Sequence, residues 1–321
     1  MHALTYEAYG SSSVLSLQEI DPPVIGDSDV LVRVHAASVN SWDRDNLQGA
    51  FANRGMLGWF KPKIRVLGGD IAGRVHAVGS AVTRWKAGDE VLCDLSNSGW
   101  GAFAEYARAP EQILAPKPAA LSFTAAAALP QAAVIALQGI RDHGQVQAGQ
   151  RVLINGAGGG VGSFAVQLAK SQGAEVTGVD SDAKLALVST QGADHMIDYR
   201  AQDYTENEQR YDFILDCELH RSPLACRRVL TPNGRLTVVG GALPRILQTF
   251  IVGSWLAKRD GQKLDVLMHQ ANKDLGYLAQ LVADGGMRSA IEREYTLAEA
   301  PLALQRMCDG EVIGKAVIVM P

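Results

Sequence analysis

The chain has 321 residues, of which 47% are hydrophobic and 33 are Gly, and its formal net charge is −4. This composition is typical of a soluble globular protein with about two domains. The slightly acidic balance provides no overall attraction to nucleic acid or to anionic membranes, so any phosphate binding must be local.

The N-terminal residues, MHALTYEAYG, lack the basic start and apolar core of a signal peptide and predict a first strand. The longest apolar run, residues 246–257, is too short to cross a bilayer. The four cysteines are scattered and form no CxxC pair, which argues against a disulfide framework or a zinc cluster. We therefore expect a cytoplasmic protein without membrane insertion.

The sequence pattern changes near residue 120. Residues 1 to about 120 alternate short β-like runs, such as those at 29–39 and 70–79, with turns. After a Pro-containing junction at 115–123, short apolar runs are each followed by a helical or polar segment, which indicates βαβ units and a parallel sheet. The last residues form a strand that could return to the first domain.

The segment RVLINGAGGGVGSFAVQLAK, residues 151–170, places five glycines within seven positions between a predicted strand and a predicted helix. Bare backbone at such a turn can approach a pyrophosphate, whose charge faces the helix N-terminus. A tight turn that merely packs is the structural alternative, but a second strand ends at Asp180, where a ribose-binding carboxylate is expected. We predict a dinucleotide site made by Ala157, Gly158, Gly159, Gly160, Val161, Gly162 and Asp180, with Ala157, Gly159 and Gly162 meeting the GxGxxG spacing.

The choice between NADH and NADPH stays open in the sequence. Asp180 can accept hydrogen bonds from the ribose hydroxyls of NADH and would repel the additional phosphate of NADPH. Ser181, Lys184 and Tyr199 offer donors and a cation in the region of that phosphate, or are solvated loop residues. Judged by charge alone, the site slightly favours NADH.

The order and spacing of several segments resemble the medium-chain dehydrogenase/reductases, specifically the zinc-independent quinone oxidoreductase-like branch. These segments include DVLVRVHAASVNSWD, LGGDIAGRVHAVGSAVTRWKAGDEV, GAGGGVGSFAVQLAK and GKAVIV. The resemblance implies an α/β protein with a β-rich, GroES-like catalytic domain at residues 1–120 and 290–321. A Rossmann domain with a doubly wound parallel sheet, residues 121–289, would bind NAD(P)H.

The resemblance also shows where zinc ligands would stand. In zinc-dependent relatives a Cys falls at Asn40 and a His at Gly69, and no four-cysteine lobe follows Cys93 here. Because zinc takes about four Cys, His or carboxylate ligands, and only Asp70 remains at these positions, we predict neither a catalytic nor a structural zinc.

Asn40 is the expected active-site donor, orienting the substrate oxygen or lining the nicotinamide pocket; an Asn that fixes a loop is the alternative. Asp43 fits the N-x-x-D pattern of the family and is expected to fix the loop that presents Asn40 rather than to act as an acid or base. Val239, Gly240 and Gly241 end a predicted strand at the edge where nicotinamide is expected.

These residues predict metal-independent hydride transfer from NAD(P)H to small molecules, namely quinones, enones or other activated carbonyl compounds. An alcohol or aldehyde dehydrogenase is an alternative that the missing zinc ligands oppose. A non-catalytic NAD(P)-binding sensor is another, because Ile135, Leu219 and His220 alter positions that the family places near the cofactor. We expect no nucleic-acid partner and a homo-oligomer.

Overall fold

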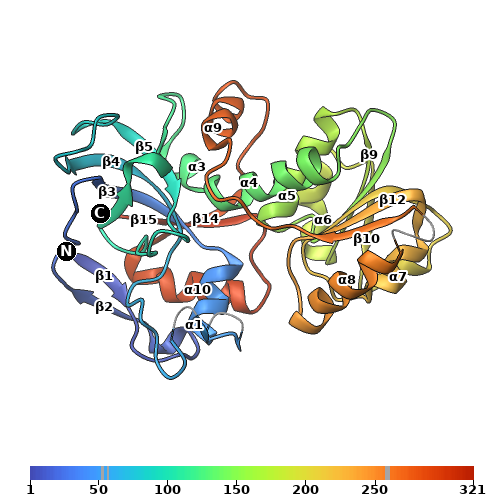
Figure 1. Cartoon of the computed structure of the whole chain (residues 1–321), viewed down its shortest axis with the longest axis horizontal. Helices are drawn as coiled ribbons and strands as arrows, with labels where there is room; N and C mark the ends of the chain where they lie inside the picture. Colours follow the sequence, from blue (N-terminus) through green and yellow to red (C-terminus); the bar gives the residue numbers. More distant parts are fainter. Residues whose placement is uncertain (52–53, 56–57, 257–260) are drawn as a thin grey trace. The chain divides into compact units, whose positions relative to one another are not determined.

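The computed structural model describes residues 1–51, 54–55, 58–256 and 261–321. The chain divides into two compact units, Met1–Val134 with Ala271–Pro321, and Ile135–Gln270. Both chain ends lie in the first unit (Figure 1). Helix α3 (Phe123–Ala127) belongs to the first unit because it packs on its strands, so the division falls later than residue 120. Helix α9 (Leu275–Ala283) belongs there too, which places the second division before residue 290.

The first unit is built on a mixed sheet of seven strands. Its order is β14 (Ile291–Thr296), β15 (Lys315–Val319), β3 (Asp29–Ser38), β4 (Asp70–Val78), β5 (Glu90–Asp94) and β7 (Ala115–Pro116), with β6 (Tyr106–Pro110) also paired to β3. The C-terminal strand β15 runs antiparallel to β3, with Val317 opposite Ser38. A separate two-stranded antiparallel sheet is formed by β1 (His2–Thr5) and β2 (Ser16–Glu19), which precede β3 in the chain.

Helices and alternating side chains close the core of this unit. Along β3, Val30, Val32 and Val34 are buried in alternation, as one face of a strand requires. Other helical segments of this unit include the 3-10 turns Ser12–Val14, Glu111–Ile113 and Leu297–Glu299, with α1 (Ser41–Gln48) and α10 (Ala300–Cys308). Helix α4 (Pro130–Leu137) and a π-helical segment (Gln138–His143) carry the chain into the second unit.

The second unit contains a six-stranded sheet in which all pairs are parallel. Its order is β10 (His195–Asp198), β9 (Glu175–Asp180), β8 (Arg151–Asn155), β11 (Tyr211–Asp216), β12 (Leu230–Val238) and β13 (Lys263–Val266). Strands β8 and β11 are buried along almost their whole length, as expected for strands covered on both faces.

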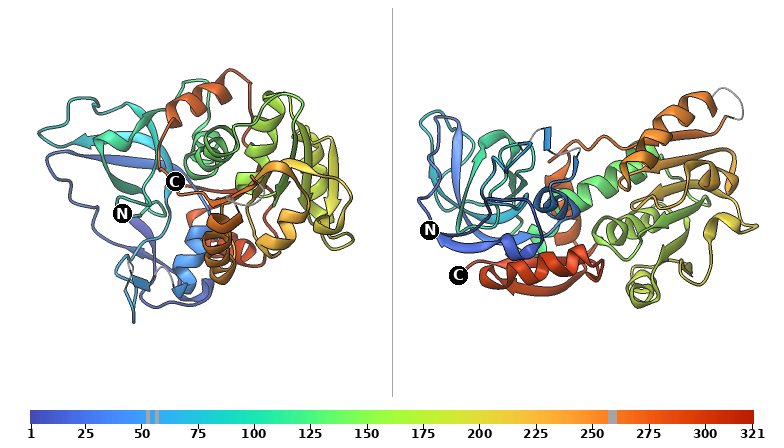
Figure 2. Two further views of the ribbon diagram at one scale, coloured as in Figure 1. Left: turned by 45° about the vertical axis from the view of Figure 1, so that its right-hand side comes forward. Right: turned by 90° about the horizontal axis from the view of Figure 1, so that it is seen from below.

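Helices connect these strands and cover both faces of the sheet (Figure 2). They are α5 (Gly160–Ser171), α6 (Asp182–Thr190), α7 (Pro223–Arg228) and α8 (Leu243–Leu256), with a 3-10 turn at Tyr204–Glu206. The chain moves outward from β8 to β10 and then returns to β11 and proceeds the other way. Right-handed crossovers in opposite directions place helices on opposite faces. This confirms the predicted doubly wound sheet, whose strand order reverses between β8 and β11.

In the described part of the chain, no helix is both long and apolar enough to cross a membrane. Helix α8 contains most of the longest apolar run, whose last residue, Ala257, lies outside the described residues. Cys93, Cys217, Cys226 and Cys308 are free thiols.

Candidate functional site: a glycine-rich turn and a buried polar network

The turn between β8 and α5 is shaped by glycines. Gly156 has a φ of +80°, a left-handed conformation that favours glycine. The backbone N–H groups of Gly156 and Ala157 donate to Val179 O at 2.9 and 3.1 Å, which ties the turn to β9. A Cβ at Gly162 would collide with the carbonyl of Gly156. Glycine is therefore required there for α5 to start so close to the turn.

Gly159 serves a different purpose from Gly162. It is the N-cap of α5 in extended conformation, and a Cβ there would contact only Gly156 O, at 3.4 Å. Without a side chain, Gly159 cannot cap the first N–H groups of the helix. Gly159, Gly160 and Val161 are half-buried, so solvent reaches this helix end. The turn fits a pyrophosphate, which would accept from these N–H groups at the positive end of α5.

Asp180 lies at the carboxyl end of β9 and is bound to the same turn. Its Oδ2 accepts from Gly158 N and its Oδ1 from Ser181 N, both at 2.8 Å. Ser181 is the N-cap of α6, and Lys184 lies in the first turn of that helix. A Cβ at Gly158 would lie 2.5 Å from Lys184 Cβ, so the bare backbone of Gly158 lets α6 approach the turn. The predicted residues of this region thus lie together.

The turn that follows β10 adds Tyr199 and a further residue, Arg200, which was not predicted. Asp198 is opposite Asp180 in the parallel register, so the residues that follow Asp198 lie beside the end of β9. Tyr199 is 42% exposed, and the guanidinium of Arg200 lies 5.7 Å from its ring centre. Arg200 is exposed and offers a second cation besides Lys184. Its position two residues after a predicted parallel strand was a usable signal.

The carboxyl ends of β11 and β12 contribute the remaining predicted residues of this unit. Val239 and Gly240 are half-buried and Gly241 is exposed, with a φ of +134°. A Cβ at Gly241 would lie 2.8 Å from Leu219 Cβ, which explains glycine at that position. Leu219 is fully buried, whereas the side chain of His220 is 76% exposed.

A buried carboxylate, Asp216, organises the loop after β11. Its Oδ1 accepts from Asn155 Nδ2 at 2.7 Å and from Glu218 N at 3.1 Å, and its Oδ2 accepts from the Tyr204 hydroxyl at 3.2 Å. Asn155 and Asp216 are the last residues of neighbouring strands at the point where the strand order reverses. Polar residues that end two apolar strands were the sequence signal for this pair.

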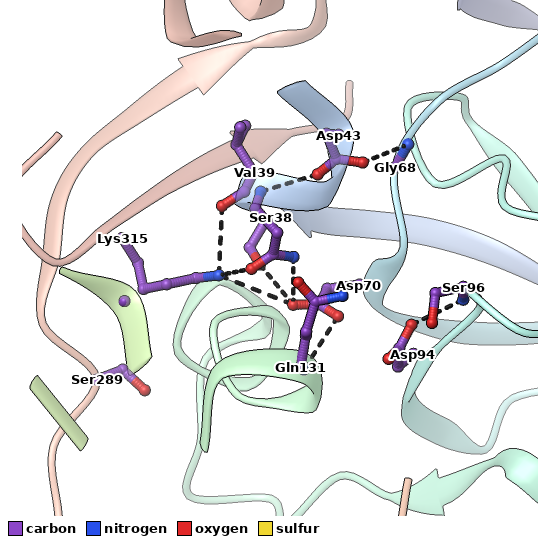
Figure 3. A network of polar contacts seen from close by, with 12 residues as sticks. Ser38, Val39, Asp43, Gly68, Asp70, Asp94, Ser96, Gln131, Ser289 and Lys315 are labelled. Atoms are coloured by element: carbon purple, nitrogen blue, oxygen red, sulfur yellow. Dashed lines mark hydrogen bonds and ion pairs between the residues drawn. The ribbon is translucent and has the colours of Figure 1, made fainter. Parts of the chain in front are cut away.

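Asn40 lies in the first unit, within a network of buried polar side chains. Figure 3 shows this network around Asp70 and Lys315. Its Nδ2 donates to Asp70 Oδ2 at 2.9 Å, and its Oδ1 accepts from Lys315 Nζ at 2.5 Å. Asn40 is 7% exposed, and Asp70 and Lys315 are almost fully buried. The amide is therefore held in one orientation by groups on β4 and β15.

Asp43, also fully buried, connects two backbone segments. Its Oδ2 accepts from Asn40 N at 2.8 Å and its Oδ1 from Gly68 N at 3.1 Å. These contacts hold the start of α1 against the residues that precede β4. Burial raises the pKa of Asp43 to about 8; Asp70 also raises it, whereas the two N–H groups and Lys315 lower it.

This pKa makes stability depend on pH. Because the pKa is higher in the folded state than in the unfolded chain, folding binds a proton between about pH 4 and 8, and the contribution of Asp43 is lost as pH rises through that window. The slope is at most about 1.4 kcal/mol per pH unit. We expect urea unfolding at several pH values to show wild type losing stability relative to Asp43→Asn as pH rises. A constant gap between the two proteins would contradict this assignment.

The described residues offer little for a metal ion. Among them, no group of three or more His, Cys, Asp or Glu side chains is arranged to hold one. Asp70 Oδ2 already accepts from Ser38 Oγ at 2.9 Å and lies 3.8 Å from the Lys315 ammonium.

Comparisons with known proteins cover both units. Residues 26–119 match the alcohol dehydrogenase GroES-like domain, and residues 191–318 match a family described as zinc-binding dehydrogenase. A chloroplastic quinone-oxidoreductase homolog from Spinacia oleracea is 30% identical over 99% of this chain and 98% of its own. A chloroplastic NADPH-dependent alkenal/one oxidoreductase from Arabidopsis thaliana is 34% identical over 79% of this chain and 66% of its own.

The fold agrees with these matches. The structure of the quinone oxidoreductase from Coxiella burnetii superposes with a TM-score of 0.88 at 29% identity, covering 100% of this chain and 99% of that one. Because the match covers the whole chain, it includes the mixed sheet of the first unit and the parallel sheet of the second. The chain therefore belongs to the medium-chain dehydrogenase/reductase superfamily, in its quinone oxidoreductase-like branch.

Proposed function

We propose that this protein reduces quinones or conjugated enones with NAD(P)H. The observation that carries the proposal is the glycine-rich turn at the reversal of the parallel sheet. The helix that follows the turn has no side-chain cap at its N-terminus, and the carboxylate of Asp180 contacts the same turn. The relatives named quinone-oxidoreductase homolog and alkenal/one oxidoreductase support the choice of acceptors.

Each residue then has a defined task. Bound NAD(P)H supplies the hydride. The N–H groups at the start of α5 hold the pyrophosphate, and Asp180 accepts from a ribose hydroxyl. The bare backbone of Gly240 and Gly241 leaves room for the nicotinamide. Asn40 donates to the acceptor oxygen as negative charge develops on it.

Zinc is not needed in this proposal. A cation bound at Asp70 would lie close to the Lys315 ammonium, 3.8 Å from the carboxylate, and would be repelled by it. Reduction of a quinone suits such a site because the phenolate product is a weak base. Alcohol oxidation would require removal of an alkoxide-forming proton, which usually calls for zinc or a dedicated base.

We propose that both NADH and NADPH are used. Asp180 favours a free ribose hydroxyl, while Lys184 and Arg200 are suitable for the 2′-phosphate of NADPH. Homo-oligomer formation and a cytoplasmic location stay predictions from the sequence. Light scattering and fractionation would test them.

The decisive experiment is to follow NADH and NADPH oxidation with a small quinone and with a conjugated enone, in excess chelator. We expect turnover with both cofactors and no effect of the chelator. Activity that disappears with chelator and returns with zinc would overturn the metal-independent assignment. Tight cofactor binding without turnover of either acceptor would favour the sensor alternative.

A further inference from the structure

Lys315 is a buried cation that no step of the proposed reaction yet uses. It is the first residue of β15 and is only 1% exposed. Its Nζ donates to Asn40 Oδ1 at 2.5 Å and to Val39 O at 3.3 Å, and forms an ion pair with Asp70 Oδ2 at 3.8 Å. An ammonium group has three donors, and these three oxygens surround it (Figure 3).

Asp70 is held as firmly as Lys315. Its Oδ2 accepts from Asn40 Nδ2 and from Ser38 Oγ, both at 2.9 Å, and its Oδ1 accepts from Gln131 N at 3.1 Å. The Asn40 amide therefore has a cation at its oxygen and an anion at its nitrogen. The flipped amide would place NH₂ against the ammonium and oxygen against the carboxylate, so the two charges select one orientation.

The geometry points to Lys315 and Asp70 as a positioning pair for Asn40, and we propose that their function is to aim the second N–H of its amide at the oxygen of the acceptor. This inference rests on the proposed function, in which Asn40 meets the substrate. The ammonium also polarises the amide through its oxygen and thereby strengthens donation from its nitrogen. The pair acts through Asn40 and does not itself contact the acceptor.

Other acidic side chains lie around this pair and must be kept in any test. Asp94 lies opposite Asp70 in the β4–β5 register, and Asp43 contacts the backbone of Asn40. Removal of the ammonium alone leaves the Asp70 side chain buried without its cation, so Lys315→Met is at risk of misfolding. The double variant Lys315→Met/Asp70→Asn removes the ion pair without changing the net charge and is the main test protein.

The matched control is Lys117→Met. Lys117 is also buried in the first unit, but its Nζ donates to Leu121 O at 2.6 Å and pairs with Glu90 at 2.8 Å, and neither contacts Asn40. Loss of this lysine tests whether removal of any buried ammonium from the unit lowers activity. We expect quinone turnover by Lys117→Met to equal that of wild type.

We expect the double variant to lose about tenfold in kcat, with Kd for NADPH unchanged because the cofactor-binding residues belong to the second unit. Asn40→Ala should lose a similar factor, and the triple variant no more than Asn40→Ala alone. Independent, multiplying losses would overturn the proposal, as would a folded double variant with full kcat.

A measurement without turnover separates this inference from the proposed function. The side-chain amide signals of Asn40, identified by their loss in Asn40→Ala, should be shifted and slow to exchange in wild type. In the double variant they should approach those of a solvated amide. If wild type reduces no acceptor but the signals change in this way, the proposed function fails while the positioning role stands. Unchanged signals would overturn the positioning role itself.

Discussion

Replacing Gly159 by Asp is expected to weaken NADH and NADPH binding at least about a hundredfold, while the melting temperature stays constant or rises slightly. The backbone at Gly159 is extended, and its Cβ position touches only Gly156 O, so the fold accommodates a side chain. Asp is a favoured N-cap, and a carboxylate near a helix N-terminus is stabilising. The same carboxylate would occupy the place of the pyrophosphate and repel it, at a cost of several kcal/mol.

Gly159→Asn is the matched control. Asn has nearly the same size as Asp and caps a helix equally well, but it carries no charge. We expect its loss of affinity to be clearly smaller than that of the Asp variant, as measured by fluorescence titration with NADPH and by thermal melting. If both variants bind NADPH as tightly as wild type, the glycine-rich turn is not part of the cofactor site.

The glycine-rich turn could be predicted because its requirements are local. Close approach at Gly162 and the left-handed backbone at Gly156 each demand glycine, so the conformation is visible in the sequence itself. Buried parallel strands likewise appear as short apolar runs. The boundary between the units was harder to predict from the sequence, because an Ala-rich helix such as α3 has the same composition whichever sheet it packs against.

The network around Asn40 was only partly predictable. Asn40 and Asp43 were found through a family pattern, but Lys315 is 275 residues from Asn40 along the chain and no local rule connects them. A lysine that begins the otherwise apolar strand KAVIV was the available signal. The contact between Lys315 and Asn40 depends on the pairing of the C-terminal strand β15 with β3, which the sequence does not show.

Asp180→Asn is expected to shift the ratio of kcat/KM for NADPH over NADH about tenfold or more toward NADPH. The amide keeps the size of the carboxylate but loses its charge, so the 2′-phosphate is no longer repelled and the hydrogen bond to the free ribose hydroxyl is weaker. Hydrogen bonds to charged groups contribute about 1.5–3 kcal/mol, which sets the expected scale. Lys184 and Arg200 remain to attract the phosphate.

Lys184→Gln should shift the ratio of kcat/KM in the opposite direction, because it weakens the binding of NADPH and leaves the binding of NADH unchanged. Its effect should shrink at high salt, because an exposed charge pair is screened. Asp180 can also have a structural effect, because its Oδ2 accepts from Gly158 N and thereby holds the turn. If Asp180→Asn weakens the binding of both cofactors equally, Asp180 acts by fixing the turn, and selectivity depends on Lys184 and Arg200 alone.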